Sequence, residues 1–209
     1  RWDEALEAAE AFIGEVEAGS PHYLAVQSYY VRAFIRFARD DVDGALADTE
    51  HSLELAERQS DPQGRYPAYA ESALVLAELG RRDRALQLAR EFLGTVGAEQ
   101  RWAGFETTTH HVLSWALTAL GAADEAAAVL GAAVDIPWTR AGVAFARGNP
   151  LAAAEILGWI GAVTSEAYCR LAAARAGDFS QLEPALAFYR SVGATRFVRE
   201  GESLLAASA

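Results

Sequence analysis

The sequence predicts an all-α protein built as a solenoid, that is, a row of antiparallel helix pairs stacked side by side. Three observations predict this fold. An Asp-x-Ala motif returns every 40 or 41 residues, and glycine or aspartate closes the helix before most of its copies. In addition, no segment alternates apolar and polar residues for long enough to indicate a sheet.

The motif defines the longer repeats of the first part of the chain and fades in the second part. Aspartate two residues before the alanine suits a helix start, because its carboxylate accepts free amide hydrogens and meets the positive end of the helix dipole. The small alanine lets a neighbouring antiparallel helix approach closely. The alanines of the four clear copies and of two weaker ones are Ala5, Ala45, Ala85, Ala126, Ala153 and Ala185.

Each repeat is therefore expected to be a helix, a tight turn and a second helix. Gly80, Gly121, Gly148 and the aspartates at 40–41 mark the turns, and prolines fall at other expected boundaries. We expect one domain over residues 1–209, with about six helix pairs, longer repeats over 1–136 and shorter repeats over 137–209. The first repeat is expected to be truncated, and a single capping helix is expected at the C-terminal end. In chain order, the expected helices are 2–18, 23–39, 43–58, 67–79, 83–96, 102–120, 124–133, 138–147, 151–162, 164–176, 181–192 and 195–207.

The last expected helix has an apolar stripe and a charged face. We expect it to pack on Leu186 and Tyr189 and to cover the open end of the solenoid. Its apolar stripe is Phe197, Val198, Gly201, Leu204 and Leu205. The residues expected to face water are Arg196, Arg199, Glu200 and Glu202.

Charge and composition exclude several classes of protein. The net charge is −11, and residues 1–62 carry 14 acidic residues against 5 arginines, so direct binding to nucleic acid is not expected. No apolar run approaches the roughly 18 residues that a membrane-spanning helix requires. The single cysteine, Cys169, is expected to be buried and fits a reducing cytoplasm. The chain lacks lysine and methionine and begins at the start of a helix, which predicts a fragment of a larger protein.

The helix–turn–helix units resemble tetratricopeptide repeats, although their period of about 40 residues exceeds the family's usual length of about 34. The stretches "ARGNPLAAAEILGWIGAVTSEAYCRLAAARAG" and "ALAFYRSVGATRFVREGESLLAASA" are similar to the C-terminal region of large bacterial, in particular actinobacterial, signalling ATPases. In those proteins a nucleotide cyclase or transcription-factor domain precedes an AAA-type ATPase. The resemblance covers residues 100–209 and implies a right-handed solenoid.

Two functions are compatible with these observations. The first is a non-catalytic scaffold for protein–protein or interdomain interaction, since stacked helix pairs leave an extended concave surface. The resemblance implies that its partner is a protein or peptide, such as the ATPase part of the same polypeptide. The second is a ligand-sensing module that binds a small molecule or peptide in the groove and regulates an upstream cyclase or transcription-factor domain. A glycine-rich phosphate loop is absent, and no cofactor is expected.

The segment "TTTHHVLSW" at 107–115 most resembles a metal site or an active site. Its histidines lie about 100° apart on a helix and therefore cannot bind one metal together, and no catalytic residue is predicted. The repeat pattern gives His110 a packing position and turns His111, Trp115 and Thr118 toward the groove. For His111 and Trp115 we consider contact with a ligand in the groove, and packing against the adjacent repeat.

Three arginines of the second helix form the other candidate. Arg32, Arg36 and Arg39 share one face of that helix with Tyr29. These arginines either pair with the acidic helices on both sides or form an anion-binding stripe for a carboxylate or phosphate ligand.

Overall fold

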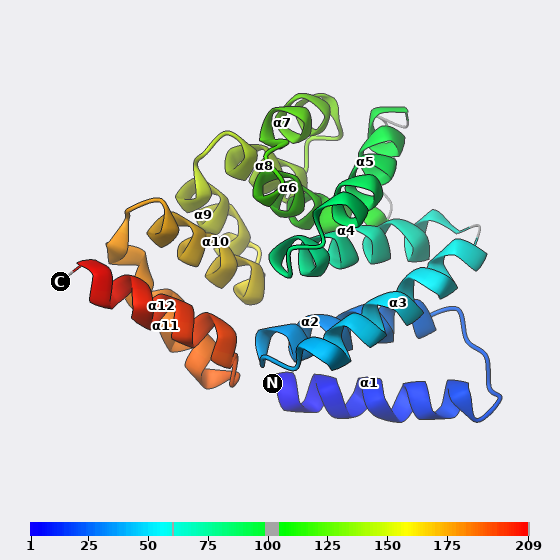
Figure 1. The fold of residues 1–209 in the computed structure, drawn as a ribbon. Coiled ribbons are helices and arrows are strands. Elements are labelled where there is room, and N and C mark those ends of the chain that lie inside the picture. The colour runs from blue at the N-terminus through cyan, green and yellow to red at the C-terminus, as the bar shows by residue number, and fades with distance from the viewer. Residues whose placement is uncertain (60, 99–104, 209) are drawn as a thin grey trace.

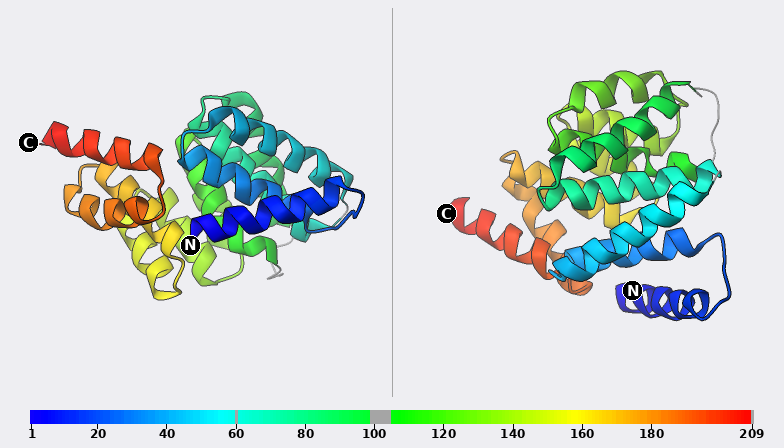
Figure 2. Two further views of the ribbon diagram at one scale, coloured as in Figure 1. Left: turned by 90° about the horizontal axis from the view of Figure 1, so that it is seen from below. Right: turned by 45° about the vertical axis from the view of Figure 1, so that its right-hand side comes forward.

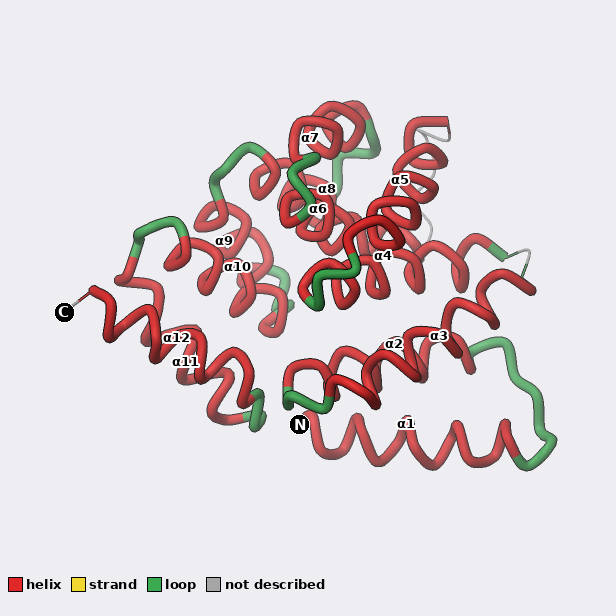
Figure 3. The backbone as a smooth tube through the Cα atoms, in the orientation of Figure 1, coloured by secondary structure: helices red, strands yellow, loops and turns green. Residues whose placement is uncertain are grey.

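The computed structural model describes residues 1–59, 61–98 and 105–208. Within these residues the chain forms twelve α-helices, two short 3-10 helices and no strand (Figure 3). The predicted all-α fold is confirmed.

In the described part of the chain, no helix is both long enough and apolar enough to cross a membrane. The 3-10 helices are η1 (Phe105–Thr109) and η2 (Phe179–Gln181), and the α-helices are α1 (Trp2–Glu17), α2 (Ala25–Ala38), α3 (Val42–Arg58), α4 (Pro62–Glu78), α5 (Arg82–Ala98), α6 (His110–Ala119), α7 (Ala123–Ala132), α8 (Pro137–Ala146), α9 (Pro150–Trp159), α10 (Val163–Arg175), α11 (Leu182–Ser191) and α12 (Thr195–Ser208).

The helices form a curved array with an inner and an outer layer (Figure 1). Each helix packs against the next along the chain. On the inner side α2 also contacts α4, α4 contacts α6, and α6 contacts α8, whereas α5 contacts α7 on the outer side. This alternation is that of an α-helical repeat-like fold.

The turns between helices adopt the backbone conformation that the sequence predicts. Gly80, Gly121 and Gly148 have φ angles of 76°, 80° and 77°, in the left-handed region that glycine enters without steric strain. Asp40 occupies the corresponding turn after α2 with φ 65°, and it is the only non-glycine residue with positive φ in the described ranges. A residue with a Cβ atom is strained in this backbone conformation, so other contacts of Asp40 must stabilise it there.

The alanines of the repeat motif lie at helix crossings. Ala45, Ala85 and Ala126 are 0% exposed, as are the weaker copies Ala153 and Ala185. Complete burial of so small a side chain is what a close helix crossing requires. The first copy is only half-buried, because α1 has a neighbouring repeat on one side only.

Helix α4 begins five residues earlier than predicted. The carboxylate of Asp61 accepts a hydrogen bond from the amide of Gln63 at 2.9 Å, and Pro62 occupies the first turn, where its missing N–H is not needed. Pro67, the predicted helix start, lies inside the helix, where it removes one backbone hydrogen bond.

The predicted helix 102–120 is also shorter in the structure. Residues 102–104 lie outside the described residues, the next five form η1, and α6 begins at His110. The ends of the other helices agree with the prediction to within three residues.

The two ends of the array meet, because α12 contacts α2 as well as α10 and α11. Phe197 of α12 is completely buried, with its ring centroid 5.7 Å from that of Phe37 and 4.6 Å from that of Tyr189. Arg39 donates a hydrogen bond to the carbonyl oxygen of Val192 at 3.0 Å. We call this contact between α2 and the α11–α12 region the seam, and through it the array curves back on itself (Figure 2).

Four charged residues of α12 were predicted to face water. Arg199 and Glu202 are exposed as predicted, whereas Arg196 and Glu200 are half-buried at contacts with other helices. Arg196 donates a hydrogen bond to the carbonyl oxygen of Phe37 at 3.1 Å, and its guanidinium lies 4.6 Å from the centre of the Phe37 ring. Arg199 pairs with Asp40 at 2.9 Å. Glu200 pairs with Arg175 of α10. Sequence reasoning missed these partners because they are distant along the chain.

The apolar side of α12 packs largely as predicted. Gly201 is buried so close to Leu186 that a Cβ atom would lie 2.7 Å from it, and the rings of Phe197 and Tyr189 stack. Leu205 is 50% exposed, so the buried stripe ends one turn earlier than predicted.

Candidate functional site

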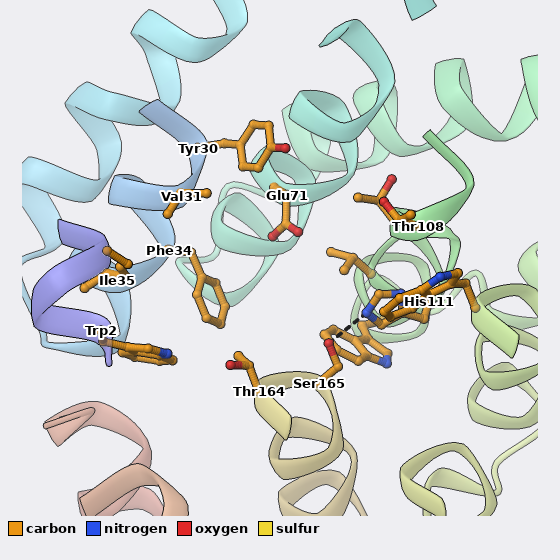
Figure 4. A pocket seen from close by; sticks show the side chains of 15 residues that line it. Trp2, Tyr30, Val31, Phe34, Ile35, Glu71, Thr108, His111, Thr164 and Ser165 are labelled. Atoms are coloured by element: carbon orange, nitrogen blue, oxygen red, sulfur yellow. Dashed lines mark hydrogen bonds between the residues drawn. The ribbon is translucent and has the colours of Figure 1, made fainter. Parts of the chain in front are cut away.

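A cavity of about 350 Å³ lies inside the curved array (Figure 4). Ligand sites commonly measure about 300–1,000 Å³. Helices α1, α2, α4, α6, α8 and α10 contribute to its wall together with η1, so the inner layer surrounds it. The described lining residues are Trp2, Ala5, Tyr30, Val31, Phe34, Ile35, Glu71, Thr108, Thr109, His111, Val112, Trp115, Trp138, Thr164 and Ser165.

One wall of the cavity is a cluster of aromatic rings held in fixed contact. The indole of Trp115 stacks on Tyr168 with 4.3 Å between centroids. The His111 ring meets the Trp115 ring edge-on at 4.7 Å and lies 5.0 Å from Trp138. Because three helices supply these rings, the wall is preorganised by packing.

The opposite wall comes from the first two helices. Trp2 of α1 meets Phe34 of α2 edge-on at 5.8 Å. Figure 4 shows both side chains across the cavity from His111. Aromatic faces therefore line the cavity on two sides.

Glu71 is an acidic side chain in this mainly aromatic wall. Its carboxylate points into the space between Phe34 and His111 (Figure 4). Within the described residues, no hydrogen bond or ion pair engages it. Burial among the surrounding helices raises the pKa of Glu71 to about 7, because the site solvates a negative charge poorly. Tyr30 lies nearby, and burial, followed by the charge of Glu71, raises the pKa of its phenol.

His111 is neutral in this environment. Burial, and then the neighbouring His110, lower its pKa to about 3, against a small opposing effect of a backbone hydrogen bond with Thr108. Its Nε2 atom lies 2.9 Å from Oγ of Ser165. A serine and a histidine at this distance resemble a nucleophile and its base. However, in the described part of the chain no carboxylate is hydrogen-bonded to the ring, and such a low pKa makes the imidazole a weak base near neutral pH.

Two of the residues predicted to line the groove lie at this cavity, and one lies at a neighbouring cavity. His111 and Trp115 line the central cavity while also packing against adjacent repeats. Thr118 lines a second cavity, of about 340 Å³, on the other side of Trp115. Its hydroxyl donates a hydrogen bond to the carbonyl oxygen of Ser114 at 2.8 Å.

The predicted residues of α2 lie away from the central cavity. Arg32 donates two hydrogen bonds to the buried carboxylate of Asp48 at 2.8 and 2.7 Å, and Arg36 donates a third at 2.9 Å. Tyr29 donates to the carboxylate of Glu17 at 2.9 Å. These contacts are those of the ion-pairing alternative, since α1 and α3 supply the carboxylates.

Arg39 behaves differently from the other two arginines. It pairs with Asp3 at 2.6 Å and also reaches Val192 at the seam. The arginines that were predicted as one stripe therefore divide between the α2–α3 contact and the closure of the array.

The remaining candidates from the sequence are packed in the interior. His110 is 3% exposed, and its Nδ1 atom lies 3.0 Å from the hydroxyl of Thr139. It thus contacts a different neighbour from His111, as expected for adjacent residues on a helix. Cys169 is completely buried. Among the described residues, no three His, Cys, Asp or Glu side chains are grouped so as to hold a metal ion.

Sequence reasoning missed most of the cavity wall. Glu71 lies in "AYAESALVLA", where a single acidic residue interrupts a mainly apolar run, and that interruption was a usable signal. Trp2 and Trp138 carry no such signal, because an aromatic residue near a helix start more often packs in the core.

Neither a family model nor a curated protein matches the chain. Among solved structures, the crystal structure of BtubC (BKLC) from P. vanneervenii is similar, with a TM-score of 0.50 and 16% sequence identity over 100% of this chain and 92% of that chain. At this level of identity the similarity concerns the fold alone, and it agrees with the all-helical, repeat-like architecture.

Proposed function

We propose that this domain is a non-catalytic helical-repeat module that binds a small molecule in its central cavity. In this proposal the helices form a right-handed, tetratricopeptide-like solenoid of about six pairs. The observation that carries it is a preorganised cavity of about 350 Å³ whose wall joins α1 and α2 to α10. A ligand there touches the first two helices and also α10, which packs against α11 and α12, so its binding favours the closed arrangement over an open one.

A sensing role follows from that coupling. The domain then acts as the regulatory part of a larger cytoplasmic signalling protein of bacteria, of the ATPase, cyclase or transcription-factor type. Ligand in the cavity stabilises the seam, and the attached effector responds to the resulting change in rigidity. The weak base character of His111 and its lack of a carboxylate partner among the described residues support a binding role rather than hydrolysis.

The test is a screen of small neutral and charged compounds by ligand-observed NMR on the wild type and on a variant with a blocked cavity. Thr164→Trp places an indole in the cavity wall, whereas Val163→Trp adds the same group at an adjacent position that is 55% exposed. Compounds that bind the cavity should lose at least about 10-fold in affinity in Thr164→Trp, equivalent to about 1.4 kcal/mol, and retain it in Val163→Trp. If no compound distinguishes the two variants, the proposal is wrong.

Interaction with another domain of the same polypeptide is the second candidate, and Trp159 favours it. This side chain is 82% exposed at the end of α9, close in sequence to the exposed Val163. Large aromatic side chains are enriched among the residues that dominate protein interfaces. Trp159→Ser should weaken binding of the remaining part of the parent protein, and Phe179→Ser, at another exposed aromatic position, should not. Equal affinities of the two variants would exclude this surface.

A further inference from the structure

We infer that the central cavity binds an organic cation, a quaternary ammonium or protonated amine, with Glu71 as its counter-ion and the aromatic side chains as its cage. This inference rests on the proposed function, since it names the ligand class of the same site. Charge, shape and exclusion of other ligand classes support it.

The charge of Glu71 is not neutralised by the described part of the cavity wall. The chain has no lysine, and no arginine occurs among the described lining residues. Tyr30 from α2 and His111 from α6 are the other titratable groups of that wall, and burial keeps both uncharged near neutral pH. Helices α3 and α5, which pack on α4 from elsewhere, contribute no lining residue among those described.

Glu71 is half-buried, and a carboxylate that is partly removed from water without a partner is unfavourable, so a cation in the cavity reduces that penalty. An anionic ligand would meet the charge of Glu71 without a cationic side chain among the described lining residues to offset it. A metal ion would find one carboxylate, since no group of three ligating side chains exists among the described residues. An organic cation is the class that one carboxylate and an apolar wall suit best.

The aromatic wall suits the shape and charge distribution of such a cation. The face of a tryptophan, tyrosine or phenylalanine ring attracts a cation within about 6 Å, most strongly when water is excluded. Trp2 and Phe34 line one side of the space that the Glu71 carboxylate enters, and His111 lies on the other (Figure 4). Trp115 and Trp138, which also line the cavity, both contact His111. A trimethylammonium group suits an aromatic wall of this kind, because it has no N–H donor and therefore needs no hydrogen-bond acceptor there.

The experiment compares choline with its uncharged analogue, in which a tert-butyl group replaces the trimethylammonium group. Trp2, Trp115 and Trp138 line the cavity, so intrinsic fluorescence titration reports binding, and calorimetry confirms the affinity. The titrations use the wild type, Glu71→Gln and a matched control, Glu54→Gln, at an exposed position of α3. Thermal unfolding verifies that all three proteins are folded.

Choline should bind the wild type and Glu54→Gln at least about 10-fold more tightly than the uncharged analogue, and Glu71→Gln should abolish that difference. Because the unliganded carboxyl titrates at about 7, choline affinity should fall about 30-fold from about pH 8.5 to about pH 5.5. Glu71→Gln should remove this pH dependence.

Two results would overturn the inference. If the uncharged analogue binds the wild type as tightly as choline, the cavity is a ligand site but not a cation site, and the proposed function stands. The same conclusion follows if choline fails to bind while compounds from the screen distinguish Thr164→Trp from Val163→Trp. Loss of that distinction as well would remove both proposals.

Discussion

The carboxylate of Asp48 is 2% exposed and accepts hydrogen bonds from two arginines of the neighbouring helix. This contact fixes α2 against α3. Since α2 carries Tyr30 and Phe34, the ion pairs on one face of the helix set the position of the cavity wall on the other. Arg32 and Arg36 thus support the cavity wall from the opposite face of α2.

Replacing Asp48 by asparagine should therefore lower the free energy of unfolding by about 2–3 kcal/mol, because it leaves Arg32 with a single weak acceptor in a nearly buried place. This loss of stability is smaller than the loss expected when a fully buried ion pair is broken, since Arg36 remains partly exposed to water. Urea unfolding measures the change. Glu50→Gln, at an exposed position of the same helix, is the control and should alter stability by less than about 0.5 kcal/mol. Equal midpoints for both variants would contradict the structural role of Asp48.

Glu71 should lower the stability of the unliganded protein at neutral and alkaline pH. Its pKa rises from 4.5 to about 7 on folding, so the unfolded chain ionises first as pH increases. Stability is unaffected by this group below about pH 4.5, decreases as pH rises toward about 7, and then stays lower. Glu71→Gln removes that loss.

We predict that Glu71→Gln is more stable than the wild type by about 1–3 kcal/mol near pH 8 and equal to it near pH 4. Urea unfolding at both pH values tests this, and Glu54→Gln should show no pH-dependent difference. A variant that is less stable than the wild type at pH 8 would mean that the carboxylate has a stabilising partner. Replacing a carboxylate that only stabilises the fold would lower stability. A gain in stability on replacement is instead typical of a residue that serves binding.

At the scale of residues, the sequence predicted the direction of a side chain on its helix better than the residues that the side chain contacts. Helical periodicity correctly separated the directions of His110 and His111, because adjacent residues point about 100° apart. It selected Tyr29, whereas Tyr30 lines the cavity. That choice depends on how α2 is rotated against α3, which Asp48 determines and no local pattern reports.

At the scale of the helices, most boundaries were predictable because start and stop signals are local. Glycine in the left-handed region ends a helix wherever it occurs, and Gly80, Gly121 and Gly148 all do so. Helix α4 is the exception, because Pro67 is a strong local signal for a helix start, whereas the structure begins the helix at the capping residue Asp61. A proline early in a helix disrupts one hydrogen bond, and tertiary packing outweighs that loss.

The repeat alanines set how closely the helices approach. Ala85 and Ala126 are completely buried, so replacing either with leucine should strain the helix crossing and lower the free energy of unfolding by about 1–3 kcal/mol. Ala47→Leu, at an exposed position of α3, supplies the control and should change stability little. Urea midpoints for the three variants decide the matter. Unaltered midpoints at both buried sites would show that the crossings have room for a larger side chain.

At the scale of the whole molecule, the closure of the array could not be predicted. The sequence predicts stacking between neighbouring repeats, whereas the seam joins residues separated by most of the chain, such as Phe37 and Phe197. No periodicity connects two such positions. The strained turn at Asp40 is explained here, because its carboxylate pairs with Arg196 at 3.2 Å and with Arg199, and glycine at that turn would lack both contacts.

The seam should control both stability and the shape of the molecule. Phe197→Ala removes a fully buried ring between α2, α11 and α12, and should lower the free energy of unfolding by about 3–5 kcal/mol. Phe179→Ala, at a position that is 43% exposed, is the matched control and should lower the free energy of unfolding far less. Small-angle X-ray scattering should show a larger radius of gyration for the first variant only, since the array opens when its ends separate.

Deleting residues 195–209 should have a stronger effect of the same kind. The deletion uncovers Phe37 and Tyr189 together, and an exposed apolar surface of this type promotes association, which light scattering coupled to size-exclusion chromatography detects. The cavity wall joins α2 to α10, so opening the seam should also change the cavity. Phe197→Ala should therefore bind any ligand of the central cavity more weakly than the wild type does. A variant that keeps the compact radius, the wild-type melting temperature and full ligand affinity would show that α12 only covers the end of the array and that the cavity does not depend on its closure.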